Sequence, residues 1–254
     1  MRIPRIFVDH ALVVNQHYNL QDSAAHHIMH VLRMKAGQSL VLFNGQGGQF
    51  AAAINSISKR GVEIITGEHS DTDCESPLQI TLVQGVSRGD RMDYTLQKAV
   101  ELGVKQIVPV LCSYTNIKLD DDKKSKRLEH WRNIIINACE QSGRNRLPEL
   151  SPIMNLDEWL QQDRNPLKLI LHPAGAMALS EIQSPTQAIT LLAGPEGGFS
   201  DDEVTLSKHC ACYPLSLGPR ILRTETAALA AISACQTLWG DFAGTDRFRP
   251  GDRP

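Results

Sequence analysis

The chain has 254 residues, 42% of them hydrophobic, which is enough for one large domain or two ordinary domains with a buried core. It has no apolar run of about 18 residues, which excludes a membrane-spanning helix, and its first residues lack the apolar stretch of a secretion signal. The net charge of −2 excludes a protein coated in positive charge, so a nucleic-acid partner would require a local basic face.

Residues 1–72 are predicted to form a small β-rich domain. Short apolar runs alternate there with turns rich in glycine, asparagine and lysine, which is the pattern of an antiparallel sheet. The strands are expected at Arg5–Val8, Ser39–Phe43, Phe50–Ile57 and Val62–Thr66.

One short helix is expected between these strands, at Ser23–Arg33. Asp22 or Ser23 can cap its first turn, because both side chains accept hydrogen bonds from free backbone N–H groups. Its apolar side is expected to carry Ile28, Val31 and Leu32.

The polar side of this helix carries His26 and His30, one turn apart, and is followed by Arg33 and Lys35. The histidine spacing suits a metal ion, but no carboxylate or cysteine lies nearby in the sequence to complete a site, so no metal is expected. Two interpretations stay open: a solvated polar face, or a surface that contacts the phosphate groups of a nucleic acid.

A polar segment, His69–Pro77, ends in proline and has no periodic apolar pattern, so the domain boundary is placed there, with residues 73–77 as the linker. Residues 78–240 form the second predicted domain. The tail, residues 241–254, is rich in Gly, Pro, Asp and Arg and is expected to be poorly ordered.

The second domain alternates strand and helix signals, which predicts an α/β fold with a mostly parallel sheet and helices on both faces. From the residues alone, the ordinary expectation is an unknotted, doubly wound sheet. The expected strands are Leu78–Gln84, Val104–Val110, Leu167–Leu171, Ala188–Ala193 and Tyr213–Leu217. The expected helices are Asp90–Leu102, Lys124–Ser142, Leu156–Gln161 and Ala227–Trp239.

Two glycine-bearing loops, Gly194–Gly198 and Leu217–Arg223, each follow one of these strands and lead into a helix. Ser200 with Glu203 forms a capping box at the first helix, and Thr224 can cap the second. Loops at the carboxyl ends of parallel strands are where open α/β sheets bind ligands, and glycine lets the backbone approach a ligand closely. One such loop often only turns the chain, but two in tandem predict a ligand site.

Four strings of this sequence resemble the RsmE family of the SPOUT superfamily, S-adenosylmethionine-dependent methyltransferases that act on N3 of a uridine in 16S ribosomal RNA. They are spread in order over most of the chain. The strings are HHIMHVLRMKAGQSLVLFNGQG, SRGDRMDYTLQKAVELGVKQIVPV, WRNIIINACEQSGRNRLPEL and the paired loops GPEGGF and LSLGPRILRTETA.

The resemblance implies a PUA-like RNA-binding β-barrel followed by a sheet tied in a trefoil knot, and a homodimer. It also implies an assembled small ribosomal subunit as substrate. The knot gathers three loops around the cofactor, so His172-Pro173 joins the two glycine loops. The implied cofactor-binding residues are His172, Gly194, Pro195, Glu196, Gly198, Leu217, Gly218, Ile221 and Leu222.

For catalysis, uracil N3 must lose a proton, so cationic donors near the base would stabilise the developing charge. The candidates are Arg144 and Arg223, with Glu140 as the most plausible general base by residue type. A surface ion pair at Glu140 and a helix-capping role for Arg144 are the alternatives. The residues expected to contact RNA are His26, His30, Arg33, Lys35, Arg88, Arg91 and Arg220.

Two other functions remain in competition: a SPOUT ribose 2′-O-methyltransferase, and a non-catalytic ribosome-assembly factor that binds RNA. The six cysteines contain no Cys-x-x-Cys pair, which favours reduced, mostly buried thiols in a cytoplasmic protein.

Overall fold

The computed structural model describes residues 3–116, 120–163, 165–174, 177–183 and 188–243. The described chain divides into two compact units. The first contains the residues up to Glu75 together with Cys139–Leu147, and the second contains Ser76–Ala138 and the residues from Pro148 on. No helix within the described residues is long and apolar enough to cross a membrane.

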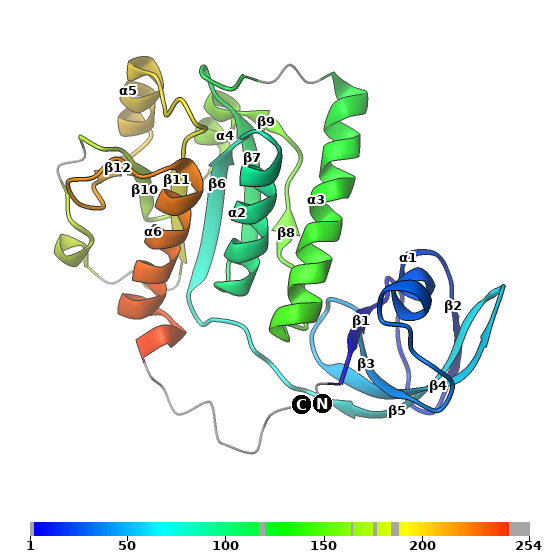
Figure 1. The fold of residues 1–254 in the computed structure, drawn as a ribbon. Helices are drawn as coiled ribbons and strands as arrows, with labels where there is room; N and C mark the ends of the chain where they lie inside the picture. Colours follow the sequence, from blue (N-terminus) through cyan, green and yellow to red (C-terminus); the bar gives the residue numbers. More distant parts are fainter. Residues whose placement is uncertain (1–2, 117–119, 164, 175–176, 184–187, 244–254) are drawn as a thin grey trace. The chain divides into compact units, whose positions relative to one another are not determined.

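The first unit is built on a sheet whose described strands follow the order β1-β3-β4-β5-β2 (Figure 1). Only the β1–β3 pairing is parallel. Alternate residues such as Leu42, Ile54 and Ile64 meet in one apolar core. The strands are β1 (Arg5–Phe7), β2 (His17–Leu20), β3 (Ser39–Phe43), β4 (Gln49–Ser58) and β5 (Gly61–Ser70). β2 was not predicted, because HYNL lacks the apolar alternation of a strand.

The predicted helix of this unit is two short helices in succession, α1 (Asp22–His26) and the π-helix η1 (His27–Val31). Leu32 N–H donates to the carbonyl of His27 at 2.9 Å, a bond that spans five residues instead of four. This wider turn changes the phase of the side chains. The predicted buried positions are therefore wrong in part: Ile28 is buried, but Val31 and Leu32 are 61% and 38% exposed.

The predicted cap of this helix is also wrong. Its N-cap residue is Gln21, whose side chain makes no capping hydrogen bond.

Residues Cys139–Leu147 belong to the first unit, although the sequence places them inside the second domain. They comprise the last turn of α3 (Asp121–Ser142) and the residues that follow it. Asn145 Nδ2 donates to the carbonyl of Thr72 at 2.8 Å, and Gly47 N–H donates to the carbonyl of Asn145 at 3.1 Å. These bonds join residues far apart in sequence, so no local pattern could indicate them.

The second unit contains a parallel sheet in the order β12-β10-β11-β6-β7-β8, with β9 also paired to β7. All strand pairs given for it are parallel, which confirms the predicted sheet type. The strands are β6 (Gln79–Gly85), β7 (Gln106–Leu111), β8 (Glu149–Leu150), β9 (Met154–Asn155), β10 (Lys168–Leu171), β11 (Ala188–Ala193) and β12 (Cys212–Leu215). β8 and β9 were not predicted, because two residues carry no periodic pattern.

Helices cover both faces of this sheet, as predicted (Figure 1). On one face Val83, Ile170 and Leu192 pack with residues of α4 (Leu156–Gln162) and α5 (Asp201–His209). Successive strand residues point to opposite faces, so the neighbours of these three face the other side. There α6 (Thr224–Trp239) packs on β6, β11 and the helix α2 (Gly89–Glu101).

Of the two predicted caps in this unit, one is confirmed and one is wrong. Ser200 Oγ accepts from Glu203 N–H at 3.3 Å and completes a capping box. Thr224 is the first residue of α6, and the N-cap is Arg223. Strand order does not test the trefoil knot, which stays a prediction. A short 3₁₀ turn, Asp241–Ala243, opens the predicted tail, whose remaining residues lie outside the described part.

Candidate functional site

Three loops of the second unit meet at one edge of the sheet. β10 pairs with β11 on one side and with β12 on the other, and all three strands run in the same direction. The loops that follow Leu171, Ala193 and Leu215 therefore leave the sheet at the same edge. His172 N–H donates to the carbonyl of Leu215 at 3.1 Å, which joins two of these loops directly.

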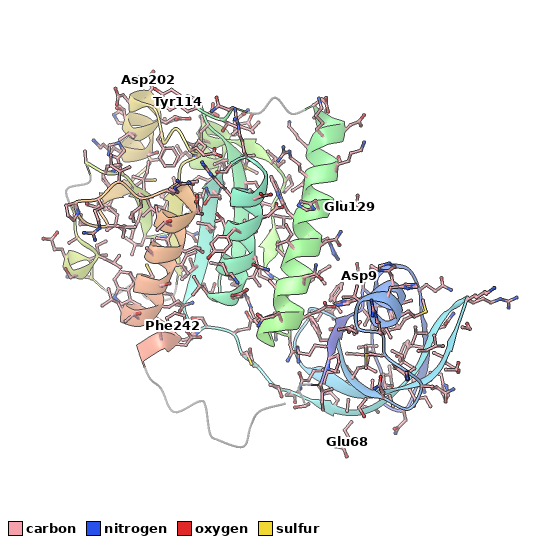
Figure 2. All side chains as sticks on the ribbon, viewed as in Figure 1. Asp9, Glu68, Tyr114, Glu129, Asp202 and Phe242 are labelled. Carbon is pink, nitrogen blue, oxygen red and sulfur yellow. The ribbon has the colours of Figure 1, made fainter. Side chains whose placement is uncertain are left out.

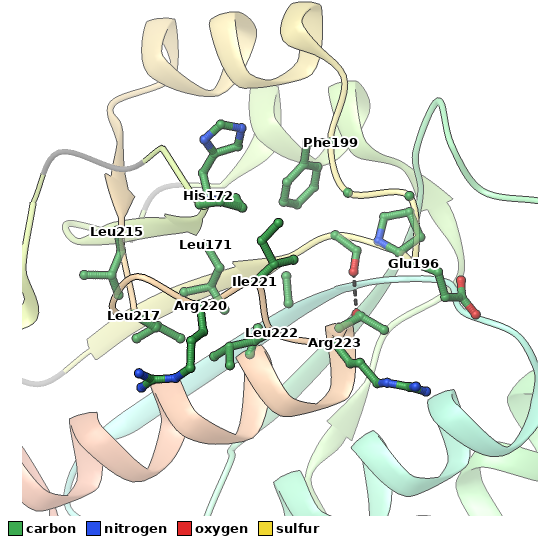
Figure 3. Close-up of a pocket in the computed structure, with 18 of the residues that line it drawn as sticks. Leu171, His172, Glu196, Phe199, Leu215, Leu217, Arg220, Ile221, Leu222 and Arg223 are labelled. Carbon is green, nitrogen blue, oxygen red and sulfur yellow. Dashed lines mark hydrogen bonds between the residues drawn. The ribbon is translucent and has the colours of Figure 1, made fainter.

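These loops enclose a cavity of about 480 Å³, within the usual size range of small-molecule sites (Figure 3). All nine residues predicted to bind a cofactor line it, and so do the predicted RNA or catalytic residues Arg91, Arg220 and Arg223. The sequence missed several other lining residues. They are Leu171, Ala193, Phe199, Leu215, Thr224 and Ala227.

One part of the cavity is apolar. Figure 3 shows Ile221 directed between Leu171 and Phe199, with Leu215 and Leu217 on a second side. Ile221 is nevertheless 86% exposed, so its side chain has little cover from the protein itself. An exposed apolar side chain in a concave site favours binding of a flat apolar group such as a nucleobase.

The Gly194–Gly198 loop reaches the cavity through a tight turn, closed by the 2.9 Å bond from Gly198 N–H to the carbonyl of Pro195. Gly198 has φ +73°, in the left-handed region, and no atom lies within 4 Å of the place a Cβ would occupy. The position thus combines a backbone conformation that favours glycine with open space in front of it.

A buried polar network fixes this loop to α6. Thr224 Oγ1 donates to the carbonyl of Gly194 at 2.5 Å (dashed in Figure 3). Gln84 Nε2, fully buried at the end of β6, donates to Thr224 Oγ1 at 3.0 Å. Thr224 therefore positions the Gly194–Gly198 loop instead of capping its own helix, α6. Sequence offered no signal for Gln84 beyond its place at a strand end.

The cations at the cavity fall into two groups. Arg220 and Arg223 are exposed and have no ion-pair partner within the described residues; Figure 3 shows their guanidinium groups directed away from Ile221. Arg91 Nη1 instead lies 3.6 Å from Glu196 Oε1. That carboxylate also accepts the backbone N–H of Arg88 at 2.9 Å, so Glu196 is engaged by the first turn of α2.

Glu140 and Arg144, the other predicted catalytic residues, belong to the first unit and do not line the cavity. Arg144 is 3% exposed, and its Nε donates to Glu75 Oε1 at 3.0 Å. Glu140 accepts the backbone N–H of Phe7 at 2.9 Å, and its other oxygen lies 3.2 Å from Nδ1 of His27. In place of the surface ion pair considered for Glu140, the structure has a largely buried contact with a histidine.

Burial raises the pKa of the Glu140 carboxyl above its ordinary value, although the Phe7 N–H and His27 oppose this. The folded protein then binds more protons than the unfolded chain between the ordinary pKa and the raised one, so stability falls as pH rises through that interval. We expect the stability of the wild type relative to a Glu140→Gln variant to decline from pH 4 upward.

Urea unfolding gives the free energy of unfolding of the wild type and of Glu140→Gln at each pH. The comparison is repeated with His27→Gln added to both proteins, which removes the titration of the histidine from the difference. A difference that grows with pH would mean that the folded protein favours the charged carboxylate.

The predicted RNA-contacting residues of the first unit form one exposed group. His26 and His30 have ring centroids 4.9 Å apart, and Arg33 and Lys35 follow them, all four exposed. No group of three metal-ligating side chains occurs among the described residues. The geometry suits contact with a polyanion, and the assignment to RNA stays a prediction.

Comparison with known domain families gives two matches. Residues 74–236 match the RNA methyltransferase domain, and residues 20–66 match the RNA methyltransferase PUA domain.

Full-length relatives carry both parts. Ribosomal RNA small subunit methyltransferase E of Buchnera aphidicola (strain APS) is 38% identical over 242 residues, 95% of this chain and 96% of the relative. The protein of that name from Bacillus subtilis is 30% identical, over 85% of this chain and 88% of the relative.

Two solved structures are similar over nearly the whole chain. A methyltransferase from Legionella pneumophila in complex with the cofactor SAM has a TM-score of 0.93 and 41% identity, with 95% of this chain and 100% of that chain covered. Ribosomal RNA small subunit methyltransferase E from Neisseria gonorrhoeae, bound to S-adenosyl methionine, has a TM-score of 0.91 and 43% identity, with the same coverage.

Proposed function

This chain belongs to the ribosomal RNA small subunit methyltransferase E family, and from that premise we propose that it methylates RNA of the small ribosomal subunit with S-adenosylmethionine. The observation that carries the proposal is a cavity of about 480 Å³ that residues of all three loops line. Two relatives more than 40% identical to this chain bind the same cofactor.

The residues that line the cavity suit each part of this cofactor. The apolar side chains Leu217, Ile221 and Leu222 would hold the adenine, and the backbone of Gly194 and Gly198 would lie along the ribose and methionine side. His172, Pro195, Glu196 and Gly218 complete the wall. When bound, the cofactor supplies a methyl group already activated by a sulfonium, so the protein must chiefly position it.

We propose N3 of a uridine as the acceptor. The new bond to N3 would form as the bond from the methyl carbon to the sulfonium sulfur breaks, the N3 proton would leave to water or a base, and negative charge would develop on the flanking carbonyl oxygens. We assign the stabilising cation to Arg223, which lines the cavity and has no ion-pair partner within the described residues. Catalytic roles for Glu140 and Arg144 stay predictions, since neither lines the cavity.

Recognition of the RNA would use both units. Arg88, Arg91 and Arg220 lie at or beside the cavity, and the group around His26 and Arg33 lies on the PUA domain. Arginines beside the cavity, together with exposed histidines and cations on the PUA domain, suit contacts with phosphate groups. Such contacts position RNA without selecting its sequence. A trefoil knot, a homodimer, an assembled subunit as substrate and a cytoplasmic location complete the proposal.

The test uses small ribosomal subunits purified from a strain in which the gene is deleted. We expect the protein to transfer labelled methyl groups to these subunits, and nuclease digestion with mass spectrometry to place the label on a uracil base. Label on ribose would support a 2′-O-methyltransferase instead. Absence of any heat with S-adenosylmethionine in calorimetry of folded protein would favour a non-catalytic assembly factor.

A further inference from the structure

An exposed aromatic residue lies beside the glycine loop of the cavity, on a hydrogen-bonded turn that follows β7. The turn is closed by Thr115 N–H to the carbonyl of Cys112 at 2.9 Å and by Cys112 N–H to Thr115 Oγ1 at 2.9 Å. Ser113 N–H donates to Glu203 Oε1 at 2.7 Å, which fastens the turn to the capping box of α5. The remaining residue of the turn is Tyr114, labelled near α5 in Figure 2.

Tyr114 lies against the glycine loop of the cavity. A Cβ at Gly197 would be 2.7 Å from Cβ and 3.3 Å from Cγ of Tyr114, so only glycine permits this approach. Gly197 itself lines the cavity. Despite this contact, 49% of Tyr114 is exposed, and its hydroxyl has no hydrogen-bond partner within the described residues. Packing within the unit therefore leaves about half of this residue open to solvent.

The surroundings of this ring are those of a nucleic-acid site. Glu196, next to Gly197, accepts the backbone N–H of Arg88 and lies near Arg91, so the glycine loop contacts the aromatic ring at Gly197 and arginines at Glu196. Unstacked RNA bases bind to aromatic side chains, and arginines beside them contact phosphate or base edges. A tyrosine has only two side-chain torsions, so it loses little conformational entropy when a base stacks on its ring.

We propose that Tyr114 is a stacking surface for a nucleobase in the RNA segment that carries the methyl acceptor. The inference rests on the proposed function and adds a specific RNA contact to it. Because Tyr114 contacts the glycine loop at Gly197 but does not itself line the cavity, we expect it to act on RNA binding and to leave cofactor binding unchanged.

The test compares Tyr114→Ala and Tyr114→Phe with the wild type, using unmethylated small subunits and S-adenosylmethionine. Loss of one base stack lowers kcat/KM for the subunit by about 5-fold to 100-fold in Tyr114→Ala. Tyr114→Phe keeps the ring and stays within about twofold of the wild type. The dissociation constant for S-adenosylmethionine, measured by calorimetry, is expected to be the same in all three proteins.

Tyr213→Ala is the matched control, since Tyr213 is 46% exposed on β12 and does not line the cavity. Equal activity of Tyr114→Ala and the wild type would overturn the inference. So would a parallel loss of cofactor affinity, which would mean that the ring only supports the glycine loop. Failure of the wild type itself to methylate subunits is a separate result and would overturn the proposed function.

Discussion

Replacing Gly198 by valine is expected to weaken the binding of S-adenosylmethionine by about a hundredfold or more. Gly198 has φ +73°, a conformation that costs an L-residue about 1–2 kcal/mol and a β-branched one more. In the cofactor-free variant, the Gly194–Gly198 loop would relax to a less strained conformation. Cofactor binding would then have to restore the original conformation, and this cost lowers the affinity. The added methyl groups would also occupy space at the cavity wall, which would cost about 1–3 kcal/mol of binding free energy. Together these effects approach 3 kcal/mol, which is a factor of about a hundred.

Gly37→Val separates backbone strain from loss of the site. Gly37 has φ +83° and open space around its Cβ position, as Gly198 does, but it belongs to the first unit and does not line the cavity. We expect Gly37→Val to lower stability and to leave cofactor affinity unchanged in calorimetry. Wild-type affinity in folded Gly198→Val would remove the Gly194–Gly198 loop from the proposed binding site.

The cavity could be predicted from sequence because its parts lie at strand ends, which local patterns locate well. Ala188–Ala193 is an uninterrupted apolar run, and the glycine and proline that follow mark where it stops. Parallel strands then bring their carboxyl ends to one edge, so the meeting of the loops follows from fold class. That the third loop, at His172, joins them came only from the family resemblance.

The environment of Glu140 and Arg144 could not be predicted, because it depends on pairing between distant residues. Charge type alone suggested that these two might interact with each other or with RNA. In the structure Arg144 binds Glu75 and Glu140 meets Phe7 and His27. Nothing in a single sequence distinguishes Glu75 from the neighbouring acidic residues of the predicted linker.

Local structure near these residues also departed from the expected periodicity. The π-helix at His27–Val31 shifts the phase of the side chains, and of its residues Ile28 is buried in the apolar core of the first unit. Polar positioning residues such as Gln84 escape prediction for a related reason. A buried glutamine at a strand end is unremarkable until the carbonyl of Gly194 and the hydroxyl of Thr224 are seen beside it.

Arg144→Met is expected to destabilise the first unit by about 3–5 kcal/mol, because it leaves the carboxylate of Glu75 partly buried without its cation. Peptide-resolved hydrogen exchange suits this measurement, since all three tryptophans, Trp131, Trp159 and Trp239, lie in the second unit. Hydrogen exchange of the β3–β5 amides should become faster by the factor that corresponds to this loss of stability. The exchange rates of amides in the second unit should not change. Arg146→Met, an exposed change in the same segment, should cost at most about 1 kcal/mol.

A second substitution distinguishes structural support from catalysis at Arg144. Adding Glu75→Gln to Arg144→Met removes the unpaired charge, so most of the protection of β3–β5 should return. If Arg144 acts only through this ion pair, methyl transfer to unmethylated subunits returns with it. If the predicted catalytic role holds, the refolded double variant binds S-adenosylmethionine normally and still fails to turn over. Protection that does not return would mean that other partners of Arg144 carry the stability, against the ion-pair explanation.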